Sequence, residues 1–388
     1  MRTSGLLTIL ALTSTLGCFS TGEEGDTTFT TADEIGDTDS TSETSASETD
    51  TGTSTDTTTT DTTTTDTTTD TTDTGVECMI DTDCDDANAC TQDTCDAGSC
   101  VATDISADCD DQDVCTQDSC DAALGCVAEP VMVIPDEQAF MASNQTQTFE
   151  VPACVGTIHV VAAGAQGGTG EGGKGAMVEG DFTVTPGEQL KLVVGSQGVI
   201  NTCGSGGGGG GTYLWRAGDV AEPLIAAGGG GGGNNNWSNV DCRKGIDAVV
   251  TTAGTSGNGP MSAPGGANGN GGSGIAPSGV GAGGAGWKSN GGDSTFGSPA
   301  TGGKAPPSFM GGVGGPSFQP GGQGGFGGGG GAVCGGGGGG GYSGGGGGEG
   351  STCRAGGGGG GSYNAGDNPN GTPGVKSGDG DLTISWGG

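Results

Sequence analysis

Positive charge and histidine are scarce in this chain of 388 residues. Ten Lys and Arg stand against 46 Asp and Glu, and His159 is the single histidine. An acidic chain of this kind repels nucleic acid and anionic lipid head groups, so we expect neither as a partner. His159 falls in a predicted strand, and no Ser/His/Asp or Cys/His set can be assembled without it. We therefore predict a non-enzymatic protein with no catalytic residue and no cofactor.

Long apolar runs are missing outside the N-terminus, so no other segment is apolar enough to cross a bilayer. Residues 1–18, MRTSGLLTILALTSTLGC, are typical of a secretory signal. The ending LGC resembles a bacterial lipoprotein cleavage site, which makes Cys18 the lipidated first residue. We expect an exported protein attached by this lipid to the outer membrane or cell surface. The alternative is a secreted protein in which Cys18 is a spare cysteine.

Residues 19–76 have almost no side chain that a core could bury. They are Thr, Asp, Ser and Glu for most of their length, as in TDTTTTDTTTTDTTTDTTDTG. Such a composition cannot offset the entropy of ordering, and its charges repel one another, so we expect a disordered stalk. Its contour length is at most about 190 Å.

Residues 77–130 contain a repeat rich in cysteine. DCDDANACTQDTCDAGSC is followed by DCDDQDVCTQDSCDAALGC at a period of about 25 residues, with Cys78 in front. Each unit is too small for a hydrophobic core, so disulfides must stabilise it. The candidates are Cys84, Cys90, Cys95, Cys100, Cys109, Cys115, Cys120 and Cys126. The pairing does not follow from the sequence.

Cysteine parity suggests a link between this repeat and the C-terminal part of the chain. Without Cys18, nine cysteines precede Cys154 and five more begin with it. Either one bridge joins the two regions, or each region has one free thiol.

Acidic side chains at the start of the repeat form a weak candidate for calcium. Asp81, Asp83, Asp85 and Asp86 are closely spaced, but an EF-hand loop would need Gly at 86 and Glu at 92, where the chain has Asp86 and Gln92. Solvated acidic loops are the simpler interpretation. Zinc is disfavoured further because the repeat contains no histidine.

Residues 131–388 form a glycine-rich domain that is predicted to be all-β. Apolar and β-branched residues mark strands in QTFEVPACVGTIHVVAA and in GDFTVTPGEQLKLVV, the latter with a turn at Pro186–Gly187. GDLTISW near the C-terminus is a further alternating strand. No segment has helical periodicity over three turns.

Glycine runs are placed symmetrically within this domain. Residues 206–211 and 228–233 flank TYLWRAGDVAEPLIAA, which predicts a hairpin of Tyr213–Arg216 against Pro223–Ala226 whose legs continue as adjacent glycine runs. Cys334 and Cys353 flank a second glycine-rich hairpin, turned at Tyr342–Ser343, and are disulfide candidates. One disulfide cannot order so many glycines, so we expect a bundle of many legs in polyproline II geometry that share hydrogen bonds.

The motifs EPLIAAGGGGGG, GAGGAGW and GGFGGGGGAVCGGGGGGGY resemble the extracellular glycine-rich domain of the anaplastic lymphoma kinase and leukocyte tyrosine kinase receptors. FEVPACVGTIHVVAAGAQGG is similar to the start of bacterial relatives of that domain. The resemblance implies a TNF-like antiparallel β-sandwich that carries a polyglycine II bundle, and a region that binds protein ligands. No ligand-contacting residue matches by motif, and the chain has no kinase domain.

The architecture of anchor, spacer and head predicts a surface lipoprotein that presents a rigid glycine-rich head for adhesion or for binding an unidentified protein or glycan. Two alternatives remain. One is a purely structural or ice-binding protein, although ice-binding faces usually have regular Thr or Ala rows that the glycine legs lack. The other is a hydrolase that relies on His159 and scattered acids.

Overall fold

The computed structural model describes residues 77–388 apart from short gaps at 170, 203, 236–239, 276–280, 296–298, 316–321, 351–353 and 388. The signal with Cys18, the stalk and Cys353 lie outside the described residues. No helix within the described part of the chain is both long and apolar enough to cross a membrane.

The described residues form an all-β protein with antiparallel sheets, as predicted. The α-helix α1 is a single turn, Val240–Arg243, and the 3-10 helices η1 (Asp81–Cys84) and η2 (Ser106–Cys109) are equally short. The absence of helical periodicity in the sequence is therefore matched by the structure.

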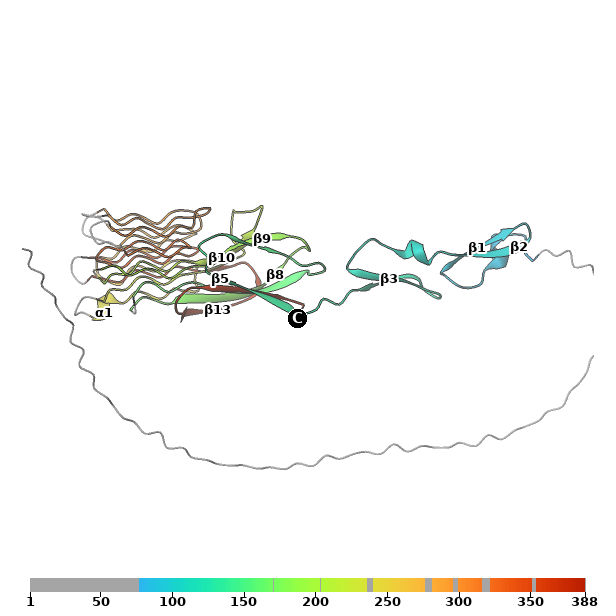
Figure 1. The fold of residues 1–388 in the computed structure, drawn as a ribbon, viewed down its shortest axis with the longest axis horizontal. Helices are drawn as coiled ribbons and strands as arrows, with labels where there is room; N and C mark the ends of the chain where they lie inside the picture. Colours follow the sequence, from blue (N-terminus) through green and yellow to red (C-terminus); the bar gives the residue numbers. More distant parts are fainter. Residues whose placement is uncertain are drawn as a thin grey trace, which may run out of the picture. The chain divides into compact units, whose positions relative to one another are not determined.

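The cysteine-rich module consists of two hairpins, one for each repeat (Figure 1). β1 (Thr91–Asp96) pairs with β2 (Ser99–Asp104), and β3 (Thr116–Asp121) pairs with β4 (Gly125–Pro130). In each hairpin two cysteines lie opposite one another, Cys95 with Cys100 and Cys120 with Cys126. The buried hydrophobic residues of this module are cysteines alone among the described residues, which explains its need for disulfides.

Two five-stranded antiparallel sheets follow in the glycine-rich domain. In spatial order, the first sheet contains β12 (Tyr363–Asn364), β11 (Ile225–Ala227), β10 (Thr212–Arg216), β9 (Gln189–Val193) and β6 (Gln147–Glu150). The second contains β13 (Asp367–Lys376), β8 (Gly175–Thr183), β7 (Thr157–Ala163), β14 (Asp381–Trp386) and β5 (Asp136–Met141).

The two sheets enclose one hydrophobic core. Alternate residues of β9 and β7 point inward, so Leu190 and Leu192 meet Ile158 and Val160, all without solvent exposure. Phe140 and Phe149 close the core with an edge-to-face contact. The strands predicted from alternation are therefore confirmed. β5 and β13 were not predicted. β5 (DEQAFM) buries Phe140 alone and lacks apolar alternation. β13 contains two prolines and pairs with β8 through register shifts.

The first predicted glycine hairpin is confirmed, and its register continues beyond the strands. Tyr213 lies opposite Ala226 in the β10–β11 ladder. Past the strand ends, the Gly209 N–H donates to Gly230 C=O and the Gly206 N–H donates to Gly233 C=O. The strand pair therefore sets the pairing of the two glycine runs that extend from it.

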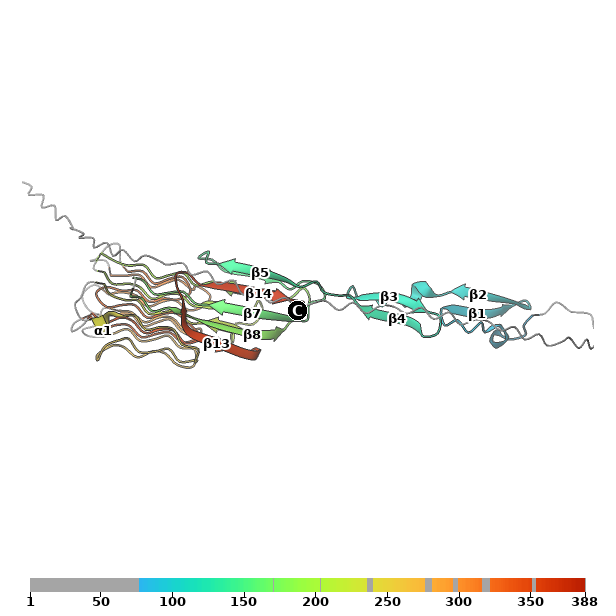
Figure 2. The same cartoon turned by 90° about the horizontal axis from the view of Figure 1, so that it is seen from below.

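The glycine runs lie side by side at one end of the domain, in both views (Figures 1 and 2). In the run of residues 206–211 the partner changes at every residue and the same partner recurs after three. Gly206 and Gly209 donate to residues 230–233, Gly207 and Gly210 to 196–199, and Gly208 and Gly211 to 327–330. One run is thus held by several neighbours, rather than by two as in a sheet.

The second predicted hairpin has the same organisation. The chain bends at residues 341–343, and the two legs meet where Gly345 and Gly348 donate to Gly339 and Gly336. The first leg also donates to residues 355–361, 206–209 and 282–285. Neighbouring runs therefore supply most of the hydrogen bonds of this hairpin.

Close approach of the runs generates a prediction about side chains. A Cβ on Gly338 would lie 2.0 Å from the carbonyl oxygen of Gly345, whereas a Cβ on the exposed turn residue Gly218 would meet nothing within 4 Å. Gly338→Ala should lower the free energy of unfolding by about 2 kcal/mol or more, because backbone has to move. Gly218→Ala should change it by less than about 0.5 kcal/mol. Chemical denaturation of both variants measures the difference, and equal values would contradict the packing.

Candidate functional site

An aromatic cluster lies on the face of β10 opposite the core. Tyr213 and Trp215 project there, against Trp287 and Phe309 from the glycine-rich loops. The ring centroids of Tyr213 and Phe309 are 5.2 Å apart, and those of Trp215 and Trp287 are 5.6 Å apart. These contacts fasten the loops to the sheet.

The three tyrosines that follow glycine runs all belong to this region. The Tyr213 hydroxyl is buried and lies 3.2 and 3.1 Å from the carbonyl oxygens of Gly327 and Gly341. Burial raises its pKa, so it remains a neutral donor. Tyr342 and Tyr363 stack at 4.6 Å. The tyrosines therefore join glycine runs to the aromatic cluster.

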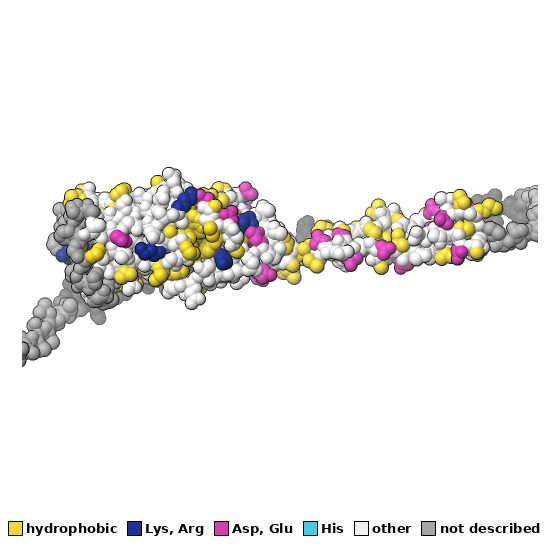
Figure 3. Space-filling view, turned by 90° about the horizontal axis from the view of Figure 1, so that it is seen from above, with side chains coloured by type: hydrophobic (Ala, Val, Ile, Leu, Met, Phe, Trp, Pro, Cys, Tyr) yellow, Lys and Arg dark blue, Asp and Glu magenta, His cyan; other side chains and the backbone are white. Residues whose placement is uncertain are grey.

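A cleft of about 590 Å³ opens beside the cluster. Its lining residues are Thr146, Lys191, Trp215, Ala217, Val220, Ala221, Trp287, Lys288, Pro306, Pro307 and Phe309. Hydrophobic side chains gather on one face of the domain with Lys and Arg beside them (Figure 3). The Trp287 indole N–H donates to Val220 C=O at 3.0 Å, which fixes the hairpin turn against the floor of the cleft. We call this hollow the aromatic cleft.

The two lysines of the aromatic cleft differ in their partners. Lys288 pairs with Glu222, which raises its pKa, and lies 5.8 Å from the centroid of the Tyr342 ring. Lys191 is exposed and lies directly opposite Trp215 in the β9–β10 ladder. It forms no ion pair with any residue that the structure describes. The aromatic cleft therefore combines an apolar floor with an uncompensated ammonium group.

A second hollow, of about 750 Å³, lies on the outer face of the other sheet. The pairing of β14, β7 and β8 places Ser385 opposite His159 and His159 opposite Asp181, so these three side chains form a row. His159 Nδ1 is 2.7 Å from Asp181 Oδ1, and the Asn368 amide donates to Asp181 Oδ2 at 2.8 Å. The Asn368 bond and then the His159 bond lower the pKa of Asp181.

This row does not make a nucleophile–base set. Among the described residues His159 has a hydrogen bond to Asp181 and none to Ser385. A serine is activated only when a base accepts its proton. We therefore interpret the pair of His159 and Asp181 as a cross-strand contact on the sheet surface.

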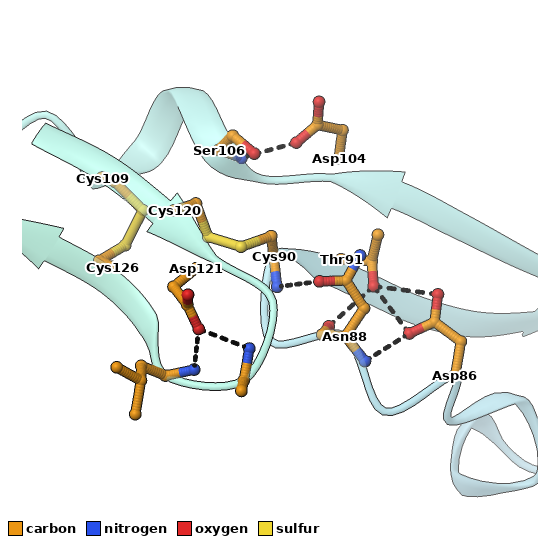
Figure 4. The surroundings of a disulfide bond; sticks show 12 residues. Asp86, Asn88, Cys90, Thr91, Asp104, Ser106, Cys109, Cys120, Asp121 and Cys126 are labelled. Atoms are coloured by element: carbon orange, nitrogen blue, oxygen red, sulfur yellow. Dashed lines mark hydrogen bonds between the residues drawn. A yellow bond between two sulfur atoms is a disulfide. The ribbon is translucent and has the colours of Figure 1, made fainter. Parts of the chain in front are cut away.

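Five disulfides connect the cysteine-rich module. They join Cys78 to Cys95, Cys84 to Cys100, Cys90 to Cys120, Cys109 to Cys126 and Cys115 to Cys154. Figure 4 shows the bridge between the repeats, Cys90–Cys120. The eight repeat cysteines predicted to form disulfides all do so. Of the two alternatives left by the odd cysteine counts, the bridge between the regions is the one present: Cys115–Cys154 joins them.

The aspartates proposed for calcium accept hydrogen bonds from N–H and hydroxyl groups of the same repeat. Asp81 accepts from the Cys95 N–H, Asp83 from the Met79 and Ile80 N–H groups, and Asp85 from the Ala87 N–H. Asp86 accepts from Asn88 and Thr91, as Figure 4 shows. Within the described residues, the one group with converging metal-type ligands is Cys78, Cys84 and Cys100, whose sulfurs are already in disulfides.

The sequence did not identify the aromatic cleft. Its residues come from segments more than 160 positions apart, between Thr146 and Phe309, and no local pattern unites them. One feature of the composition could have pointed to it: tryptophan is rare in this chain, and two of its four tryptophans line the cleft.

A family of repeats described from the slime mould Dictyostelium matches residues 83–105 and 108–131. The match covers the two cysteine repeats and none of the glycine-rich domain beyond residue 131. No curated protein matches the chain significantly.

The Asp181 contacts predict a pH effect. Asn368→Ala should raise the pKa of Asp181 toward its ordinary value of about 4, because the first of the two bonds that lower it is lost. A lowered pKa stabilises the fold above about pH 4, and this stabilisation is lost as the pH falls through the folded pKa. NMR titration of the Asp181 carboxyl measures the shift. Asn370→Ala is the matched control, since Asn370 bonds Glu179 instead. An equal shift in both variants would refute the assignment.

Proposed function

We propose that the protein is a non-enzymatic, surface-exposed lipoprotein whose glycine-rich head binds a partner protein through the aromatic cleft. The observation that carries this proposal is the aromatic cleft itself, an apolar hollow with the exposed Lys191 at its rim. Its volume lies within the range of about 300–1,000 Å³ in which proteins bind small molecules, so the cleft has room for a side chain of a partner.

The chemistry of the aromatic cleft selects the contacting group. The walls of Val220, Pro306 and Pro307 accept an apolar side chain, and Lys191 attracts a carboxylate. A protein surface with an apolar residue beside an acidic group meets both requirements.

The finer fold belongs to the same proposal. Return to the same partner at every third residue is what a threefold polyproline II helix requires, so the glycine runs are proposed to be polyglycine II helices. The sheets that carry them are proposed to form a TNF-like sandwich related to the glycine-rich domain of the anaplastic lymphoma kinase and leukocyte tyrosine kinase receptors. Such a bundle makes the head rigid, which lowers the entropy cost of binding.

In this proposal the N-terminal part of the chain attaches the protein to the membrane and sets the distance between the membrane and the glycine-rich head. Lipidation at Cys18 would hold the chain at the cell surface, and the stalk would separate the head from the membrane. The disulfides of the module suit the oxidising exterior of a cell.

The aromatic cleft is tested by a small probe that carries both groups. The full-length protein, labelled with 5-fluorotryptophan, is titrated with N-acetylphenylalanine, and the ¹⁹F signals of Trp215 and Trp287 are expected to shift. The signal of Trp386, which lines the other hollow, should not move. The amide of the same probe lacks the carboxylate and should bind about fivefold more weakly, the value of one exposed ion pair.

Two variants locate the contact. Lys191→Gln should weaken N-acetylphenylalanine about fivefold and abolish the difference between acid and amide. Lys244→Gln removes an exposed lysine that does not line the cleft and should leave binding unchanged. Ala221→Trp should fill the opening and prevent the shifts. Binding that survives Ala221→Trp would refute this site.

The wider proposal has its own test. Surface plasmon resonance of the full-length protein against an array of cell-envelope and matrix proteins should yield a partner whose affinity falls in Lys191→Gln and not in Lys244→Gln. A partner indifferent to both variants would leave adhesion standing and reject the aromatic cleft. Absence of any binder would reject adhesion.

A further inference from the structure

The disulfides of the repeats follow a rule that extends beyond one repeat. Inside each repeat the first and last cysteines pair, Cys84 with Cys100 and Cys109 with Cys126. The second cysteine of each repeat bonds forward. Cys90 reaches Cys120 in the next repeat, and Cys115 reaches Cys154 in the glycine-rich domain. Cys154 therefore occupies the place that the third cysteine of another repeat would take.

Forward bonding makes the covalent loops overlap without a break. The loop closed by Cys78–Cys95 ends after the next loop has begun at Cys84, and each later loop likewise begins before its predecessor ends. Every peptide bond from Cys78 to Cys154 consequently lies inside at least one disulfide-closed loop. No single cut in this stretch divides the protein into two separate pieces.

We propose that the cysteine-rich module is a cleavage-tolerant tether. It keeps the glycine-rich domain covalently attached to the N-terminal part of the chain after a protease has cut the backbone between Cys78 and Cys154. Cleavage adds one water across a peptide bond and leaves the disulfides intact. Detachment then also requires a dithiol reductant, which is oxidised to its own disulfide while the spanning cystine becomes two thiols.

The module is the part of the described chain where such cuts are expected. It has no aliphatic core, and the connection between β4 and β5, residues 131–135, has no regular structure. Met132 and Ile134 in that connection are 89% and 80% exposed. Exposed irregular segments are preferred sites of proteolytic nicking. Because the proposed function places the protein outside the cell, this connection is where a protease cut would matter most.

Three stretches of the module are enclosed by a single disulfide-closed loop. Residues 79–83, 101–108 and 127–153 each lie inside one loop alone, closed by Cys78–Cys95, Cys90–Cys120 and Cys115–Cys154 respectively. Loss of one of these three bridges should therefore expose one defined stretch to detachment by a single cut and leave the other two protected.

The test places a cleavable sequence in the longest of these singly enclosed stretches, residues 127–153. The recognition sequence of a site-specific protease is inserted between Met132 and Val133 of the full-length chain, which is then cut to completion. On a denaturing gel without reductant the product should migrate as one covalent species, and after dithiothreitol as two fragments. Two fragments without reductant would overturn the proposal.

A matched variant isolates the bridge responsible. With the same insertion, Cys115→Ser combined with Cys154→Ser should give two fragments without reductant. In that double variant, a recognition sequence moved to the exposed turn between Ala97 and Gly98 should still give one species, because Cys84–Cys100 and Cys90–Cys120 enclose it. One species from the first insertion would refute the role of Cys115–Cys154.

Misfolding of the double variant would not hide the answer. Mass spectrometry of an unreduced digest of the unmodified protein should recover the peptide containing Cys115 joined to the one containing Cys154. The peptides with Cys90 and Cys120 should likewise be joined. Recovery of either pair with other partners would contradict the overlapping loops.

Discussion

The structure of the glycine-rich domain depends on one constraint: a glycine run has no side chains, so its N–H and C=O groups must find their hydrogen-bond partners in neighbouring segments of the chain, almost always in their backbone. The run from Gly228 to Gly233 meets it completely. All six of its N–H groups donate, five to backbone carbonyls and one to the Ser362 hydroxyl, and all six of its carbonyls accept from backbone N–H groups. Because the partners change at every residue, a run can be satisfied only when several neighbours surround it. The glycines are required for the same reason, since a Cβ on Gly231 would lie 2.0 Å from the Gly357 carbonyl oxygen.

The two five-stranded sheets supply what glycine cannot supply, a defined starting register. The β10–β11 pair buries Leu214 and Ile225 in the core and, through the same ladder, sets Gly206 and Gly209 opposite Gly233 and Gly230. Glycine alone has no side chain by which one register differs from another. The aromatic cluster then marks the boundary, because its rings fasten the loops to the sheet where the strands end. The aromatic cleft lies at this boundary. It is lined by the rings of Trp215, Trp287 and Phe309, by the hairpin turn at Val220 and Ala221, and by Pro306 and Pro307.

The cysteine-rich module and the glycine runs are both stabilised without a core of aliphatic side chains, but by different interactions. Among the described residues both have only single-turn helices, and neither the disulfide-linked repeats nor the glycine runs have an aliphatic core of their own. The head replaces side-chain packing with shared backbone hydrogen bonds, which requires many runs together. The module is too small for that and uses covalent bonds, with aspartates as acceptors in each turn, such as Asp86 for Asn88 and Thr91. Cys115–Cys154 joins the two regions covalently.

The sequence by itself determined the all-β class, the strand alternation in Leu190–Val193, the disulfide framework, and the hairpin centred between Asp219 and Val220. These features are local: period-two alternation, cysteine spacing and symmetry of glycine runs are visible within a short window.

Only the tertiary structure decided which cysteines pair, because the spacing of equivalent cysteines is compatible with bonds inside a repeat and bonds to the next. It also decided β13, in which Asn370, Gly371 and Thr372 pair with Glu179, Val178 and Met177 of β8 although Pro369, Pro373 and Gly374 disfavour a strand. The aromatic cleft and the row of Ser385, His159 and Asp181 depend on strand order, which places distant residues side by side. The single histidine was visible in the sequence, but its partner Asp181 was not, since contact across a sheet is decided by pairing and not by sequence distance.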